Sequence, residues 1–155
     1  MTDLQRLIER HEGRRTHPYL DCCGQPWRAC ACAVKGNLTV GIGRNLDAVP
    51  FTEDELLMML NLDLVRAITA ARRLCSVYDR LTVARQHVLI SMAFNLGETR
   101  LAKFSRFLSA VHLEDWSGAA DEMLDSRWAK QVGDRPGQRA DELAQMMRTG
   151  SAEWV

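Results

Sequence analysis

The chain has 155 residues, 20 Lys and Arg against 20 Asp and Glu, and 46% hydrophobic residues. This length suits one domain with its own core, and this composition is typical of globular rather than disordered or fibrous proteins. The net charge of zero provides no general basic field, which argues against a protein dedicated to binding nucleic acid.

The first predicted element is a helix that ends at Gly13. Thr2 and Gln5 have the spacing of a capping box, which marks a helix start. The residues that then fall on one helical face are Leu4, Leu7, Ile8 and His11. From Arg14 to about Leu46, glycines and prolines separate short apolar pieces such as Leu38–Ile42. This pattern predicts a small, loop-rich β-sheet.

After Pro50 the pattern becomes helical. Thr52 and Glu55 form a second capping box, followed by apolar residues at helical spacing to about Leu74. Further helices are predicted over Val83–Asn95, Leu101–Val111, Trp116–Leu124 and Arg139–Met147. The sequence therefore predicts an α+β protein, with one N-terminal helix, a small sheet and a helical remainder reached through a long helix.

Two carboxyl groups near the predicted sheet are candidates for catalysis. Glu12 closes the first helix, where the partial negative charge of the helix end disfavours ionisation. Asp21 lies in a loop before the turn at Gly24. Hydrolysis of a glycosidic bond needs one neutral carboxyl to protonate the leaving oxygen and one ionised carboxylate. Two acids at this spacing occur in almost any globular chain, so the pair alone indicates only an α+β domain.

Longer motifs extend the argument. In chain order they are Glu12–Gly13, Tyr19–Asp21, Leu38–Gly43, Ala93–Thr99, Asp125–Trp128 and Arg139–Gly150. Together they resemble the phage-type lysozymes, glycoside hydrolase family 24, over nearly the whole chain. The resemblance implies a single lysozyme-like domain over residues 1–155, with a sheet-containing lobe at about 13–50 and a helical lobe at 75–155. The long helix would join the lobes, and the N-terminal helix would pack on the helical lobe.

The resemblance also implies an activity and its residues. The family cuts the β-1,4 bond between N-acetylmuramic acid and N-acetylglucosamine in peptidoglycan, and needs no metal or organic cofactor. By position, Glu12 matches the general acid, Asp21 the second carboxylate, and Thr39 the hydroxyl that helps to place water. The matches for substrate binding are Phe94 and Asn95 as cleft-lining residues, and Arg139 as the residue that pairs with the catalytic Glu.

Two other functions remain open. A lytic transglycosylase cuts the same bond with one catalytic Glu and leaves an anhydro product, so the presence of Asp21 and Thr39 favours hydrolysis. A catalytically silent peptidoglycan-binding module would be expected to lack Glu12 or Asp21, and both are present.

The resemblance implies a setting as well. The N-terminus has no apolar segment of a secretory signal, and no stretch approaches the roughly 20 apolar residues of a membrane span. We therefore expect a monomeric endolysin that waits in the host cytoplasm, without stable membrane insertion, until a holin-like lesion admits it to the cell wall.

The chain departs from the family between Asp21 and Thr39, where a longer loop contains Cys22, Cys23, Cys30 and Cys32. Free thiols are the default for a protein made in the cytoplasm, and a disulfide formed after release is the next interpretation. Zinc is the third, because adjacent cysteines are a poor chelate compared with the usual spacing of two to four residues.

A second departure is Arg44, where some members have a His paired with an Asp. Arginine can keep a charge pair but cannot titrate near neutral pH.

Overall fold

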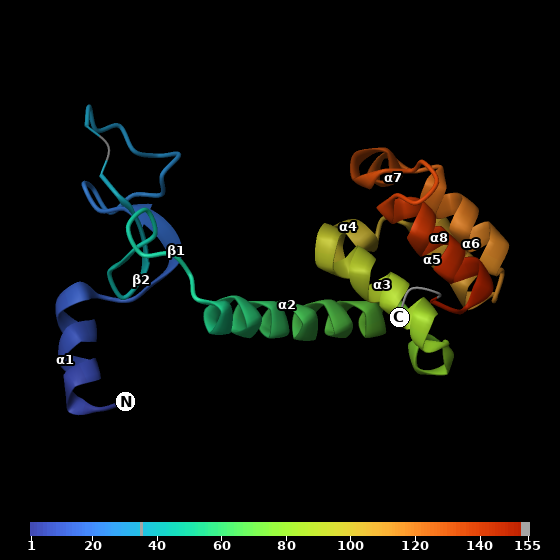
Figure 1. The fold of residues 1–155 in the computed structure, drawn as a ribbon, viewed down its shortest axis with the longest axis horizontal. Coiled ribbons are helices and arrows are strands. Elements are labelled where there is room, and N and C mark those ends of the chain that lie inside the picture. The colour runs from blue at the N-terminus through green and yellow to red at the C-terminus, as the bar shows by residue number, and fades with distance from the viewer. Residues whose placement is uncertain (35, 153–155) are drawn as a thin grey trace. The chain divides into compact units, whose positions relative to one another are not determined.

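A computed structural model describes residues 1–34 and 36–152, so the last three residues of the predicted helical lobe lie outside the described residues. The chain forms two compact units, Met1–Leu56 and Leu57–Val155, whose elements are labelled in Figure 1. The described residues contain eight α-helices and a three-stranded antiparallel sheet, which confirms the predicted α+β class.

The first unit contains α1 (Asp3–Glu12) and the sheet. The predicted capping box is confirmed, because Gln5 N–H donates to Thr2 Oγ1 while Thr2 N–H donates to the Gln5 side chain. The strands lie in the order β1 (Arg15–Leu20), β2 (Leu38–Gly41) and β3 (Arg44–Asn45). The helix therefore leads directly into an edge strand.

The pairing of the strands determines which side chains this unit buries. Tyr19 on β1 and Asn45 on β3 both lie opposite Thr39, which is at the centre of the sheet. Leu20 and Thr39 are the buried side chains among the described residues of this unit. Since burial of apolar surface is the main source of stability, the sheet unit depends strongly on directional contacts.

The second unit is helical. Its helices are α2 (Glu53–Leu74, which begins in the first unit), α3 (Val83–Leu96), α4 (Glu98–Leu101), α5 (Ser105–His112), α6 (Trp116–Leu124), α7 (Arg127–Val132) and α8 (Arg139–Thr149), with a 3-10 turn at Tyr78–Arg80. Helix α6 packs against α5 and α8 (Figure 1). Within the described part of the chain, none of the helices has both the length and the apolarity to cross a bilayer.

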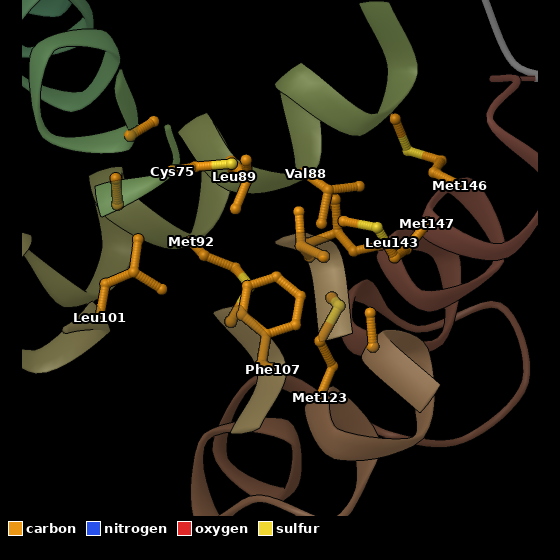
Figure 2. Packing of buried hydrophobic residues seen from close by; sticks show 14 of the residues in the cluster. Cys75, Val88, Leu89, Met92, Leu101, Phe107, Met123, Leu143, Met146 and Met147 are labelled. Atoms are coloured by element: carbon orange, nitrogen blue, oxygen red, sulfur yellow. The ribbon is translucent and has the colours of Figure 1, made fainter. Parts of the chain in front are cut away.

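The core of the second unit is an apolar cluster built from α3, α5, α6 and α8. Figure 2 shows Met92, Phe107 and Met123 directed toward one another, with Leu143 and Met147 beside Val88. Cys75 is also buried at the edge of this cluster, and burial raises the pKa of its thiol. Each fully buried side chain of this size contributes roughly 1.5–3 kcal/mol, so this cluster holds the helical unit together.

The helix boundaries mostly match the prediction. The second capping box and the end of the long helix at Leu74 are confirmed, as is Trp116–Leu124. The predicted helix over Leu101–Val111 is wrong at its start, because the chain turns before α5 begins at Ser105. Helix α7 was not predicted. The packing of α1 on the helical lobe stays a prediction.

Replacing Phe107 by Ala should destabilise the protein by about 3–5 kcal/mol, because the ring is only 1% exposed and its removal leaves a cavity. Val65→Ala on α2, where the side chain is exposed, should change stability by less than about 0.5 kcal/mol. Urea denaturation followed by circular dichroism measures both. A loss below about 1 kcal/mol for Phe107→Ala would contradict the position of the ring in the core.

Candidate active site

Glu12 is the last residue of α1, and its carboxyl group lies against the turn between β2 and β3. A Cβ atom on Gly43 would be only 2.9 Å from Glu12 Oε2 and 3.4 Å from Cδ. Gly43 also has φ +73°, in the region that glycine adopts most easily. The turn can therefore approach the carboxyl group so closely only because glycine occupies this position.

Asp21 directly follows β1, and Asn37 from the other end of the loop holds its carboxylate. The backbone N–H of Asn37 donates to Oδ1 at 2.9 Å, and its side-chain Nδ2 donates to Oδ2 at 3.0 Å. Gly36 lies against the same group, because a Cβ atom there would be 1.9 Å from Asp21 Oδ1. Two donors on different oxygens fix the orientation of the carboxylate.

Thr39 is only 5% exposed, and its hydroxyl donates to the backbone carbonyl of Asn37 at 3.3 Å. Asn37 thus contacts Asp21 through its N–H groups and Thr39 through its carbonyl. The structure brings these three residues together. Asn37 was not among the predicted site residues, because its contact with Asp21 arises from the pairing of β1 with β2.

In the helical unit, Phe94 and Arg139 line one groove. The groove has a volume of about 430 Å³, and its walls are mostly apolar side chains from α2, α3 and α8. Phe94 is 45% exposed, so its ring is available for contact. Arg139 begins α8 and donates to Ser91 Oγ at 3.1 Å. The groove therefore offers an apolar face beside a positive charge.

Asn95 has a contact of its own. Its side-chain oxygen accepts a hydrogen bond at 2.8 Å from the indole N–H of Trp128, which is buried and packs edge-on against Phe104. The amide oxygen of Asn95 is thus already bonded to the core residue Trp128. The amide nitrogen is the group left to donate to a ligand.

Arg44 follows Gly43 and forms a charge pair, as the sequence predicted for an Arg. Its partner is Glu55, which it contacts through both terminal guanidinium nitrogens, and a third bond of 2.7 Å reaches the carbonyl of Pro50. Hydrogen bonding to Arg44 lowers the pKa of Glu55, and the Thr52 N–H adds to the effect. This pair ties β3 to the start of α2.

The loop beside Asp21 contains the one group of side chains, among the described residues, whose positions could suit a metal ion. The sulfur atoms of Cys22, Cys23, Cys30 and Cys32 all lie within 4.8 Å of one another. Hydrogen bonds among these thiols, first with Cys22, raise the pKa of Cys32 to about 12. Trp27 in the same loop is 53% exposed.

Comparison with known proteins identifies a family for this sequence. The sequence model of the family described as phage lysozyme matches residues 9–145. The pre-baseplate central spike protein of Enterobacteria phage T4 is 28% identical in an alignment of length 167 that covers 97% of this chain. This chain spans only 28% of the length of that spike protein. The protein named probable T4-type lysozyme 2 of Dictyostelium discoideum is 22% identical over 97% of this chain and 96% of its own length. Probable T4-type lysozyme 1 of that organism is 27% identical over 59% of this chain and 55% of its own.

Arg44→Met should lower the stability in a pH-dependent way. Because the pKa of Glu55 is lowered in the folded state, the pair contributes fully above the ordinary Glu pKa of about 4.3. Its contribution is lost as the pH falls through the lowered value. Urea denaturation should therefore give a constant difference from wild type between pH 5.5 and 7.5, which shrinks below about pH 4.

Arg66→Met is the matched control, since the Arg66–Asp63 pair is largely exposed and should contribute about 0–1 kcal/mol. A step near pH 6.5 in the Arg44→Met difference would mean that a histidine is linked to this pair. A difference that persists unchanged to pH 2 would show that Glu55 is not its source.

Proposed function

This chain belongs to the phage lysozyme family, and we propose that it hydrolyses the β-1,4 bond between N-acetylmuramic acid and N-acetylglucosamine in peptidoglycan. The observation that carries the proposal is the location of two candidate carboxyl groups in one small unit, next to the same sheet. Gly43 lies against the carboxyl group of Glu12, and Asn37 donates two hydrogen bonds to the carboxylate of Asp21. Family membership and the named lysozyme relatives support a peptidoglycan-hydrolysing activity.

In the proposed mechanism, Glu12 is the general acid that protonates the glycosidic oxygen as the bond breaks. Asp21 is the second carboxylate and stabilises the positive charge that develops on the sugar. Thr39 positions the attacking water. Since its hydroxyl hydrogen is directed to the Asn37 carbonyl, the lone pairs of Oγ1 are left to accept a bond from that water. A water held between Thr39 and Asp21 has an acceptor for each of its two hydrogens.

Phe94, Asn95 and Arg139 are proposed to bind substrate from the helical unit. The exposed ring of Phe94 offers an apolar face for a sugar, and the Asn95 amide nitrogen can donate to an acetamido or hydroxyl oxygen. Arg139, whose Nη2 donates to Ser91, is proposed to pair with the catalytic Glu.

Two other activities are the competing candidates. A lytic transglycosylase would have no need for a positioned water, and the contact between Asn37 and Thr39 favours hydrolysis over that route. A silent binding module would have no need to hold Asp21 with two donors. We therefore place hydrolysis first.

The proposed biological role is that of an endolysin. The protein would act as a monomer on peptidoglycan glycan strands and release phage progeny by lysing the host cell. It would remain in the host cytoplasm until a holin opens the membrane, and the activity itself would need no cofactor.

The first test is mass analysis of the fragments released from purified Gram-negative peptidoglycan by wild type and by Glu12→Gln. Wild type should release fragments with reducing muramic-acid ends, and the variant should lose 10²-fold or more of the activity because the proton donor is absent. Anhydro ends would identify a transglycosylase. No fragments from wild type would identify a binding module.

Gly43→Ala should reduce the activity by about 10- to 100-fold, because the added methyl group displaces the Glu12 carboxyl. Gly41→Ala is the matched control. Gly41 has a similar φ of +68°, but a Cβ atom there meets nothing within 4 Å. Both variants should lose about 1–2 kcal/mol of stability from backbone strain. Only Gly43→Ala should also show the loss of activity, measured where both variants are folded. Equal activities of the two variants would contradict the proposed role of the turn.

A further inference from the structure

The four cysteines of the loop form a compact group of sulfur atoms. Cys22 Sγ lies 3.8 Å from Cys23 Sγ and 3.7 Å from Cys30 Sγ, and all four sulfur atoms lie within 4.8 Å of one another. In a tetrahedral zinc site with Zn–S bonds of about 2.3 Å, neighbouring sulfur atoms are about 3.8 Å apart. The separations from Cys22 Sγ to Cys23 Sγ and to Cys30 Sγ therefore have the length of a tetrahedral edge.

A disulfide does not account for this group equally well. The separations of 3.7 and 3.8 Å far exceed the S–S bond length of about 2.05 Å. A disulfide also pairs two sulfur atoms and gives no reason for a second pair to join them. Four converging sulfur atoms are the arrangement that one metal ion requires.

The loop that carries the cysteines buries little apolar surface, although several hydrogen bonds order its ends. It runs from residue 21 to residue 37, beyond the roughly 15 residues at which loops without secondary structure become uncommon. Trp27 and Val34 in it are exposed, and among its described residues no side chain is classed as buried. Segments with too little apolar burial are commonly held by a metal or by disulfides.

We propose that Cys22, Cys23, Cys30 and Cys32 bind one Zn²⁺ ion as four thiolates and thereby cross-link the two halves of this loop. Structural zinc sites with four thiolates are almost always tetrahedral, the geometry whose edge length Cys22 Sγ makes with Cys23 Sγ and Cys30 Sγ. Binding releases the four thiol protons and leaves the site with a net charge of −2. The guanidinium of Arg15 donates to the carbonyl of Gly24, the residue after Cys23, at 2.6 Å and brings a positive charge to this turn.

Cys22 and Cys23 are adjacent in the sequence, and adjacent cysteines are normally a poor chelate for zinc. The turn that follows β1 removes this objection. The N–H groups of Cys23 and Gly24 both donate to the carbonyl of Leu20, so the chain reverses at these residues. The two sulfur atoms are then 3.8 Å apart rather than on opposite sides of an extended chain. Each can occupy one corner of a tetrahedron.

The site would also support Asp21. Cys22 and Cys23 follow Asp21 directly, while Cys30 and Cys32 lie in the segment that returns to Gly36 and Asn37. Asn37 holds the Asp21 carboxylate, and Gly36 packs against it. A metal that joins the two halves of the loop therefore limits the separation of Asp21 from Asn37.

The test is metal analysis of protein purified without chelator, together with thiol titration of the native chain. We expect about one zinc per chain. A thiol reagent should react slowly before chelation, and four more thiols per chain should react after zinc is removed. Cys22 and Cys23 are exposed, so in a metal-free protein they would react at once with or without chelator.

Cys32→Ser should lose most of the zinc, whereas Cys75→Ala, which changes the buried fifth cysteine, should retain it. Co²⁺ in place of zinc should give the strong visible absorption of a tetrahedral thiolate site. Iron in place of zinc, thiols that appear only after reduction, or five free thiols without metal would each overturn the proposal. Zinc content does not depend on the proposed hydrolase activity, so the two can fail separately.

Discussion

The candidate site depends on the antiparallel pairing of β1 with β2. Because Tyr19 lies opposite Thr39 and Leu20 opposite Leu38, the ends of the connecting loop meet, and Asp21 comes beside Asn37. A one-residue slip would exchange the two faces of β2 and turn Thr39 away from its buried position. The register of the sheet thus allows Asn37 to bond both the Asp21 carboxylate and the Thr39 hydroxyl.

The two units are stabilised by different physical effects. The helical unit has a continuous apolar cluster, while the sheet unit buries few side chains and uses hydrogen bonds, capping and the Arg44–Glu55 pair. Local unfolding costs least where few apolar contacts are broken. The proposed catalytic carboxyl groups therefore lie in the sheet unit, which buries few apolar side chains. The proposed binding residues Phe94 and Asn95 lie on the helical unit, which has the larger apolar core.

Sequence reasoning predicted the elements that have strong local signals. Capping boxes at Thr2 and Thr52 marked two helix starts, because the partners are three residues apart and need no tertiary contact. The break before Ser105 was missed because Leu101 and Phe104 continue the apolar spacing across a turn. Helix α7 has only six residues, too few for a period to be recognised. Asn37 was missed because its role comes from strand pairing, which spacing does not reveal.

The long loop after Asp21 poses a problem that the sheet alone does not solve. The Asp21–Asn37 bonds join two exposed segments, and ordering a backbone residue costs about 1–2 kcal/mol. The few hydrogen bonds of the loop, which each contribute about 1 kcal/mol net, offset only part of this cost for its 17 residues. A cross-link within the loop shortens the segment that the Asp21 contacts must order. The cysteines lie between Asp21 and Asn37, so a cross-link among them would reduce the conformational entropy lost when this loop is ordered.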